Sequence, residues 1–420
     1  MKACKIPYCK DIPNDWQEIP NRYLFAYHSV KVGEHWKDYQ LLSLTTSGIK
    51  EKDINASGGK IPDSYDKYQT VEPGDMVFCL FDLDVSAVFS GLSNHYGMIT
   101  SAYDVVKPNR NILNQGFSDY WFQYVFSNRY YKMYSKNIRF TITSEMFKAI
   151  KTPVPPLVIQ KKIACFLNEK TAKIDKLIEI ENKQIEKLKE YKQAVITEAV
   201  TKGLDKSAPM KDSGVEWIGK IPEEWNIIQT KFLFEIITGS TPDSGDTNNW
   251  DGDIKWITPA DFKTENVYVE KGKRNISLVG LKSCSTTVIP KDNIIFSKRA
   301  PIGLVAININ DLCTNQGCLS CVKKGNFSTK YFYYQMSVMT EFFELFGSGT
   351  TFKEISAQKF GSFKLIFPDE QAQFNIVVYL DKKCAEIDSL ISIKQKKIDM
   401  LNEYKKSLIY EYVTGKKEVV

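Results

Sequence analysis

The chain has 420 residues and a mass of 48.1 kDa, a length that predicts two to four domains at roughly 150 residues each. Hydrophobic residues make up 43% and charged residues 25% of the sequence, values typical of folded soluble proteins, which excludes wholesale disorder. The net charge is only +6, so binding to a nucleic acid would have to rest on local clusters of basic residues.

Export and membrane signals are missing from the sequence. No apolar run approaches the roughly 20 residues of a membrane-spanning helix, and the first residues, Met1 to Lys5, lead into polar sequence. The nine cysteines are scattered and odd in number, which favours reduced thiols over a disulfide framework. We therefore expect a cytoplasmic protein.

A long segment of the sequence occurs twice. Residues 155–201 align without a gap on residues 368–414 at a constant offset of 213. Apolar residues recur three and four positions apart in both copies, which predicts two amphipathic helices of about 40 residues and roughly 60 Å. Because each helix has one apolar stripe, we expect the two to pack as an antiparallel coiled coil. The matched pairs include Gln160/Gln373, Leu167/Leu380, Asp175/Asp388, Leu177/Leu390, Tyr191/Tyr404 and Lys192/Lys405.

A second, shorter repeat precedes each globular segment. Ile12-Pro13 with Trp16 matches Ile221-Pro222 with Trp225 at an offset of 209. Their fixed place after Ile-Pro favours a role for both tryptophans as core anchors over stacking platforms. The predicted fold class is α+β: two mixed α/β domains separated by two long helices, with a pseudo-two-fold internal repeat.

Catalytic motifs are absent from the sequence. There is no dinucleotide-binding glycine motif, no Walker loop and no Asn-Pro-Pro-Tyr/Phe motif of an amino-methyltransferase. Cys318 and Cys321 have the spacing of half a zinc site, but no second cysteine pair follows. We therefore interpret both as small core residues of a strand. We expect no catalytic residue, no metal and no cofactor, so any cofactor chemistry would come from partners.

Several motifs resemble the specificity subunit of type I restriction-modification enzymes, and the resemblance covers nearly the whole chain. The motifs are Asp212 to Trp225, Gly239-Ser240-Thr241-Pro242, Thr314-Asn315-Gln316-Gly317, Gly347 to Ile355, Tyr65-Asp66-Lys67-Tyr68 and Pro73 to Phe78.

The resemblance implies a non-catalytic subunit that recognises double-stranded DNA. Residues 1–154 and 221–367 are then target recognition domains, here called the first and second head, and each reads one half of a bipartite site. Residues 155–203 and 368–415 are the long helices, and the linker 204–220 joins the first of them to the second head. The helices carry methyltransferase subunits, of which we expect two, and nuclease/translocase subunits are a further partner that the resemblance leaves open.

Candidate DNA contacts in the second head lie at the ends of predicted strands and in a glycine-rich loop. Arginine pairs bidentately with guanine or grips phosphate, short amides suit adenine, and hydroxyls and loop amides hold phosphate. The candidates are Ser297, Lys298, Arg299, Thr314, Asn315, Gln316, Ser348, Thr350 and Lys353. The alternative is that these residues have no role in DNA binding and belong to a solvated strand end and an ordinary turn.

The first head offers fewer signals, because it lacks the Lys-Arg pair and the Gly-Ser-Gly loop. Its candidates are Thr45, Thr46 and Lys50 in a polar strand-turn, with Lys136 and Arg139 at the position of the glycine loop. An alternative function also remains open. A coiled-coil scaffold that presents two protein-binding heads would explain the repeat and the modest net charge equally well.

Overall fold

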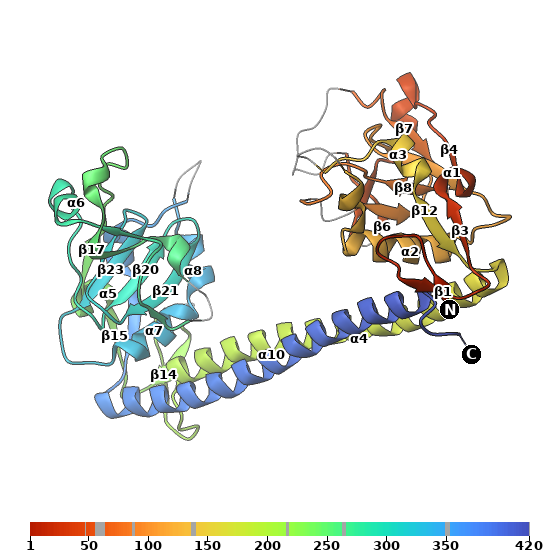
Figure 1. Cartoon of the computed structure of the whole chain (residues 1–420). Coiled ribbons are helices and arrows are strands. Elements are labelled where there is room, and N and C mark those ends of the chain that lie inside the picture. Colours follow the sequence, from red (N-terminus) through yellow and green to blue (C-terminus); the bar gives the residue numbers. More distant parts are fainter. Residues whose placement is uncertain are drawn as a thin grey trace. The chain divides into compact units, whose positions relative to one another are not determined.

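The computed structural model describes residues 1–46, 48–54, 64–85, 89–135, 140–215, 218–262, 266–348 and 353–419. The chain divides into two compact units. The first unit contains Met1–Asn182 and Gln395–Val420, and the second contains Lys183–Lys394. Each unit therefore combines one head with one segment of each long helix (Figure 1).

The first head is built on a four-stranded antiparallel sheet in the order β4-β11-β8-β9. Phenylalanines and other aromatic side chains from α2 pack on this sheet and form the core. The sheet strands are β4 (Phe25–Tyr27), β11 (Asp104–Pro108), β8 (Met76–Phe78) and β9 (Ser90–Leu92). Four further pairs of strands are β1 (Lys2–Ala3) with β2 (Asp11–Ile12), β3 (Gln17–Pro20) with β12 (Lys151–Val154), β5 (Leu42–Thr45) with β6 (Gly48–Glu51) and β7 (Gln69–Val71) with β10 (Gly97–Ile99). The helices are α1 (Asn21–Leu24), α2 (Gln115–Ser127) and α3 (Ser144–Ala149).

The second head contains a five-stranded sheet in the order β16-β23-β20-β21-β18 and a three-stranded sheet in the order β19-β17-β22. Helices α7 and α8 contact β21. The strands of the larger sheet are β16 (Phe234–Thr238), β23 (Cys318–Lys323), β20 (Ile294–Lys298), β21 (Ile302–Asn308) and β18 (Tyr268–Val269), and those of the smaller sheet are β19 (Arg274–Ile276), β17 (Trp250–Ile257) and β22 (Cys313–Thr314). A separate pair joins β15 (Asn226–Gln229) with β24 (Lys364–Phe367), and the helices are α5 (Thr230–Leu233), α6 (Leu278–Ser283), α7 (Thr329–Ser337), α8 (Thr340–Leu345) and α9 (Ala357–Ser362). In the linker, β13 (Met210–Asp212) pairs with β14 (Lys220–Pro222), which ends at the start of the second head.

The two long helices are α4 (Leu157–Lys202) and α10 (Glu370–Val413). In the first unit, Ile163 near the start of α4 shares a core with Leu408 near the end of α10. In the second unit, Val200 at the end of α4 shares a core with Ile376 at the start of α10. Opposite ends meet in both units, which confirms the predicted antiparallel pair.

Both helices end at a glycine that rests on the repeated tryptophan. Gly203 and Gly415 have φ angles of +76° and +68°, the left-handed conformation that terminates a helix at low cost in glycine. A Cβ on Gly203 would lie 3.1 Å from Trp225, and one on Gly415 would lie 3.1 Å from Trp16. Since both tryptophans are buried, they are core anchors, as the sequence indicated.

The repeat is also visible in buried hydrogen bonds. In the first unit, the Gln160 side chain accepts from the backbone N–H of Asn114, the residue that caps α2. In the second unit, Gln373 accepts from the N–H of Ser328, which caps α7. The same glutamine therefore fixes the start of the same helix in each unit.

Among the helices of the described residues, none is both long and apolar enough to cross a membrane.

Candidate nucleic-acid interface

Three segments of the second head that contain candidate DNA contacts are joined by backbone hydrogen bonds. The backbone N–H of Lys298 donates to Gly317 (2.9 Å), and the N–H of Ile355 donates to Lys298 (3.1 Å). Ser348 and Glu354 exchange two backbone hydrogen bonds of 3.1 and 3.0 Å. The end of β20, the loop before β23 and the segment from residue 353 onward thus form one continuous surface, here called the loop cluster.

Glu354 sets the electrostatics of the loop cluster. Its carboxylate lies 2.7 Å from Nζ of Lys298 and 3.2 Å from Nη1 of Arg299. The Lys298 side chain is only 10% exposed, whereas that of Arg299 is 35% exposed. Arg299 is therefore the cation of this pair that a ligand can reach, and Lys298 serves the internal ion pair.

Ser297 and Thr314, two further candidate residues of the second head, are buried, as Lys298 is. Ser297 is fully buried and its hydroxyl donates to the carbonyl of Pro301. Thr314 is 1% exposed, with its hydroxyl 3.3 Å from that of Ser320. Ser297 is buried because β20 is the middle strand of a five-stranded sheet and is buried along its whole length. Thr314 lies on β22, which pairs with β17 in the three-stranded sheet.

The remaining candidates of the second head differ in accessibility. Asn315 is half-buried, and its side-chain oxygen accepts from the N–H of Gly317 at 2.9 Å. Gln316, Ser348 and Lys353 are exposed. Thr350 lies outside the described residues.

Sequence reasoning missed two contributors to the loop cluster. Thr241 donates its hydroxyl to the side-chain oxygen of Gln316, and Glu354 neutralises both cations. The Gly-Ser-Thr-Pro turn that contains Thr241 was visible in the sequence, but its contact with Gln316 depends on tertiary structure.

In the first head, Thr45, Thr46 and Lys50 lie on the β5–β6 hairpin and line a cleft of about 820 Å³. The cleft is also lined by α2 and by the segments of α4 and α10 that belong to the first unit. Thr45 donates its hydroxyl to the carbonyl of Gly48 at 2.8 Å, while Thr46 and Lys50 are exposed. Lys50 has no carboxylate within ion-pair distance among the described residues. Lys136 and Arg139 lie outside them.

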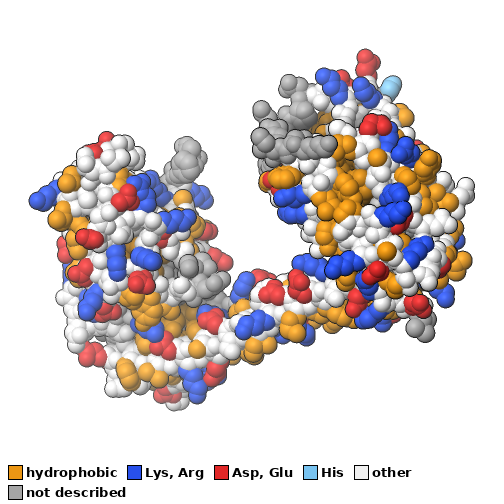
Figure 2. Space-filling view, viewed as in Figure 1, with side chains coloured by type: hydrophobic (Ala, Val, Ile, Leu, Met, Phe, Trp, Pro, Cys, Tyr) orange, Lys and Arg blue, Asp and Glu red, His pale blue; other side chains and the backbone are white. Residues whose placement is uncertain are grey.

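Charges of both signs are interspersed over the visible face of each unit, as Figure 2 shows. This distribution agrees with the small net charge.

The cysteines give no sign of a metal centre. Cys318 and Cys321 are both buried, and burial raises the pKa of each thiol well above its ordinary value. No group of three or more histidine, cysteine or acidic side chains with metal-binding geometry occurs among the described residues.

The fold is internally duplicated, with one framework carrying two dissimilar heads. The chain belongs to the type I restriction modification DNA specificity domain family, whose sequence profile matches residues 99–190 and 222–415. The family and the fold class predicted from the sequence are both confirmed.

Two relatives come from Methanocaldococcus jannaschii. The type I restriction enzyme MjaIX specificity subunit is 35% identical over 189 residues, which cover 44% of this chain and 43% of the relative. The putative type I restriction enzyme MjaX specificity subunit is 29% identical over 319 residues, covering 74% of this chain and 70% of the relative.

Solved structures share the fold over nearly the full length. A chain from a structure of the assembly and conformational transition of a type I restriction-modification system matches with a TM-score of 0.72 and 15% identity, covering 97% of this chain and 99% of that one. The HsdS subunit from Thermoanaerobacter tengcongensis matches with a TM-score of 0.50 and 14% identity, covering 97% and 98%.

Proposed function

We propose that this chain is the non-catalytic DNA specificity subunit of a type I restriction-modification system. The first head, residues 1–154, and the second head, residues 221–367, are its target recognition domains, and each reads one half of a bipartite site. The observation that carries this proposal is family membership combined with a duplicated framework that holds two different sets of loops.

Two heads that recognise different half-sites need different loops on a shared framework. The buried glutamines Gln160 and Gln373 repeat, whereas the exposed candidates do not: the second head offers Arg299 and Gln316, and the first offers Thr46 and Lys50. Because base identity is read by side chains in the groove, different side chains on the same framework select different half-sites.

The loop cluster supplies both kinds of DNA contact. Arg299 is suited to a bidentate contact with guanine or to a phosphate, and the amide of Gln316 is suited to adenine. Lys353 and Ser348 are exposed groups suited to phosphate. In the free protein, the ion pair with Glu354 keeps the Arg299 side chain oriented. When DNA binds, a group of the DNA replaces Glu354 as the partner of Arg299. Asn315, Thr350, Lys136 and Arg139 are further candidates for contacts of the same kinds.

The helix pair carries a duplicated apolar surface that fits a partner bound twice. In the first unit, Leu177 and Tyr404 are 44% and 56% exposed. Their repeat counterparts in the second unit, Leu390 and Tyr191, are 48% and 56% exposed. Equivalent exposed apolar residues at equivalent places favour two copies of one partner. We assign these two apolar surfaces to two methyltransferase subunits, which supply the catalytic residues and the cofactor. Nuclease/translocase subunits are further members of the same complex, which acts in the cytoplasm.

The experiment that tests this function is sequencing of methylated bases in a host that expresses the chain with its methyltransferase subunit. We expect one methylated motif with two specified parts separated by unspecified bases. Methylation of a single continuous motif, or none that depends on this chain, would contradict the proposal.

A further inference from the structure

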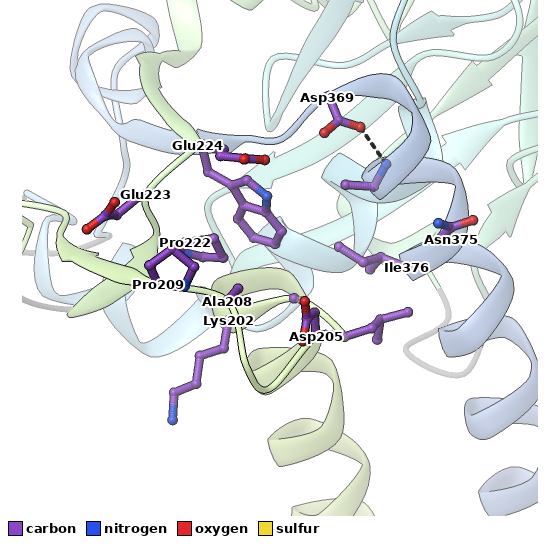
Figure 3. Close-up of a pocket in the computed structure, with 14 residues that line it drawn as sticks. Lys202, Asp205, Ala208, Pro209, Pro222, Glu223, Glu224, Asp369, Asn375 and Ile376 are labelled. Carbon is purple, nitrogen blue, oxygen red and sulfur yellow. Dashed lines mark hydrogen bonds between the residues drawn. The ribbon is translucent and has the colours of Figure 1, made fainter.

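Charge is unevenly distributed over the second unit. A pocket of about 350 Å³ where α4 ends and α10 begins is acidic, and this disfavours contact with DNA phosphate there (Figure 3). Among its described lining residues, the charged ones are Lys202, Asp205, Glu223, Glu224 and Asp369. The segment 271–274, at the start of β19 in the second head, has the opposite charge.

This segment is the densest basic run in either head. Lys271, Lys273 and Arg274 occupy three of its four positions, and no other four consecutive residues of 1–154 or 221–367 hold three lysines or arginines. All three side chains are exposed, and none has a carboxylate within ion-pair distance among the described residues. Because the net charge of the chain is small, binding to DNA has to rest on local clusters of this kind.

A buried tryptophan holds Arg274 in a fixed orientation. The guanidinium carbon of Arg274 lies 3.9 Å from the centre of the Trp250 ring. Trp250 is only 6% exposed and packs edge-on against Trp256, with 5.2 Å between the ring centres. A guanidinium that stacks on an aromatic ring keeps the N–H groups along its edge free for a further partner. Arg274 therefore presents oriented donors that make no hydrogen bond among the described residues.

The same two tryptophans hold the turn that contacts Gln316. Their indole N–H groups donate to two carbonyls of the turn 240–243, those of Ser240 and Asp243, each at 3.1 Å. Within this turn, Thr241 donates its hydroxyl to the side-chain oxygen of Gln316. One buried tryptophan pair thus positions both Arg274 and, through the turn, the candidate reader Gln316.

The strand register brings Arg274 and Gln316 to the same end of the three-stranded sheet. Trp256 on β17 pairs with Arg274 on one side and with Cys313 on the other. Neighbouring strands lie about 4.8 Å apart, so the backbones of Arg274 and Cys313 are about 10 Å apart. From Cys313 the chain runs through β22 past the end of the sheet to Gln316. About 10 Å corresponds to roughly three base-pair steps of 3.4 Å, so one half-site can reach both side chains.

We propose that Arg274 is a specificity-determining residue of the second head, which contacts a guanine in the same half-site as the base read by Gln316. The inference rests on the proposed function. A guanidinium held flat on a ring is suited to donate two hydrogen bonds to O6 and N7 of guanine, which need a planar fork at a fixed place. Lys271 and Lys273 contact the flanking phosphates as mobile point charges.

The test compares Arg274→Lys and Arg274→Ala with the control Arg22→Ala, each in the complex with the methyltransferase subunit. Arg22 is an exposed arginine of the first head, with its guanidinium carbon 5.8 Å from the centre of the Tyr23 ring. Competition titrations measure binding of the cognate duplex and of duplexes that are each substituted at one base pair. In both Arg274 variants we expect the preference at one position of the second half-site to fall about tenfold or more. Lysine fails with alanine because it keeps the charge but lacks the fork.

The preferences in the first half-site should stay unchanged in the Arg274 variants, and the control should retain every preference in the second half-site. Because Arg274 is exposed, the melting temperatures of the variants should equal that of the wild type. Unchanged preferences in folded Arg274 variants, a uniform loss over all duplexes, or the same loss in the control overturns the inference.

Failure of this inference and failure of the proposed function are distinguishable. If the wild-type complex methylates a bipartite motif and the Arg274 variants retain every base preference, only the role of Arg274 is rejected. If the wild-type complex methylates no bipartite motif, the function itself is rejected.

Discussion

Nζ of Lys192 lies 2.7 Å from the carboxylate of Asp388 in the second unit. The first unit repeats this relationship: Nζ of Lys405 lies 2.7 Å from Asp175, and both residues are offset by 213 from their counterparts. The exposures agree as well, at 27% and 51% in one pair and 28% and 55% in the other. One ion pair is therefore built twice by two antiparallel helices, which fixes their register through side chains as well as through the apolar stripe.

The two ion pairs should contribute equally to stability. Because both are half-exposed, we expect a coupling free energy of about 0.2–1 kcal/mol for each, obtained from a double-mutant cycle of alanine substitutions at Lys192 and Asp388 and a second at Lys405 and Asp175. Chemical unfolding of the full chain supplies the measurement. Clearly unequal couplings would mean that the pairs are not equivalent.

Gln160 should be far less replaceable than an exposed glutamine. Its side chain is fully buried, accepts from Asn114, and donates to the carbonyls of Ile112 and Pro155 at 2.9 and 2.8 Å. Gln160→Leu leaves these backbone groups unpaired, at a cost of about 2–4 kcal/mol. Gln371→Leu, an exposed site on α10, is the control and should change thermal melting little. Equal effects of the two substitutions would argue against the capping role.

Arg299→Ala should weaken DNA binding by the assembled complex. A base contact predicts a loss of about 1–3 kcal/mol and a relaxed preference at one position of the motif. A phosphate contact predicts a uniform loss across sequences and a salt slope lower by about one. The measurement is titration of cognate and singly substituted duplexes at two salt concentrations, with Lys364→Ala as an exposed control outside the loop cluster. A folded variant with unchanged affinity would remove Arg299 from the interface.

Asp119 should make stability depend on pH. Loss of solvation raises the pKa of this α2 carboxyl to about 6, although it accepts from the backbone N–H of Leu92 and from Gln123. The unfolded value is about 3.9, so the folded protein binds the extra proton, and stability falls as the pH rises from about 4 to above 6. In Asp119→Asn this part of the pH dependence disappears. Melting of both proteins at pH 5 and pH 7.5 tests it, and identical pH profiles would contradict the assignment.

The framework was predictable from the sequence because its residues obey a constant offset. Gln160 and Gln373, Asp175 and Asp388, and the two tryptophans repeat because each makes the same contact in its own unit. Periodicity within one segment was sufficient to predict the helices and their pairing.

The interface was less predictable because it depends on the order of strands in a sheet. Ser297 reads as the exposed end of a strand, yet β20 lies in the middle of five strands and is buried throughout. The pairing of Glu354 with Arg299 joins residues 55 positions apart, and no local pattern reports such a contact.

The measurement that tests the central claim most directly is an exchange of the second head. Residues 221–367 are replaced by the matching segment of a relative with a different target, and methylated bases are sequenced in a host that also expresses the methyltransferase subunit. If each head reads one half-site independently, one half of the bipartite motif changes and the other half stays the same. A motif that changes in both halves, or in neither, would contradict the account.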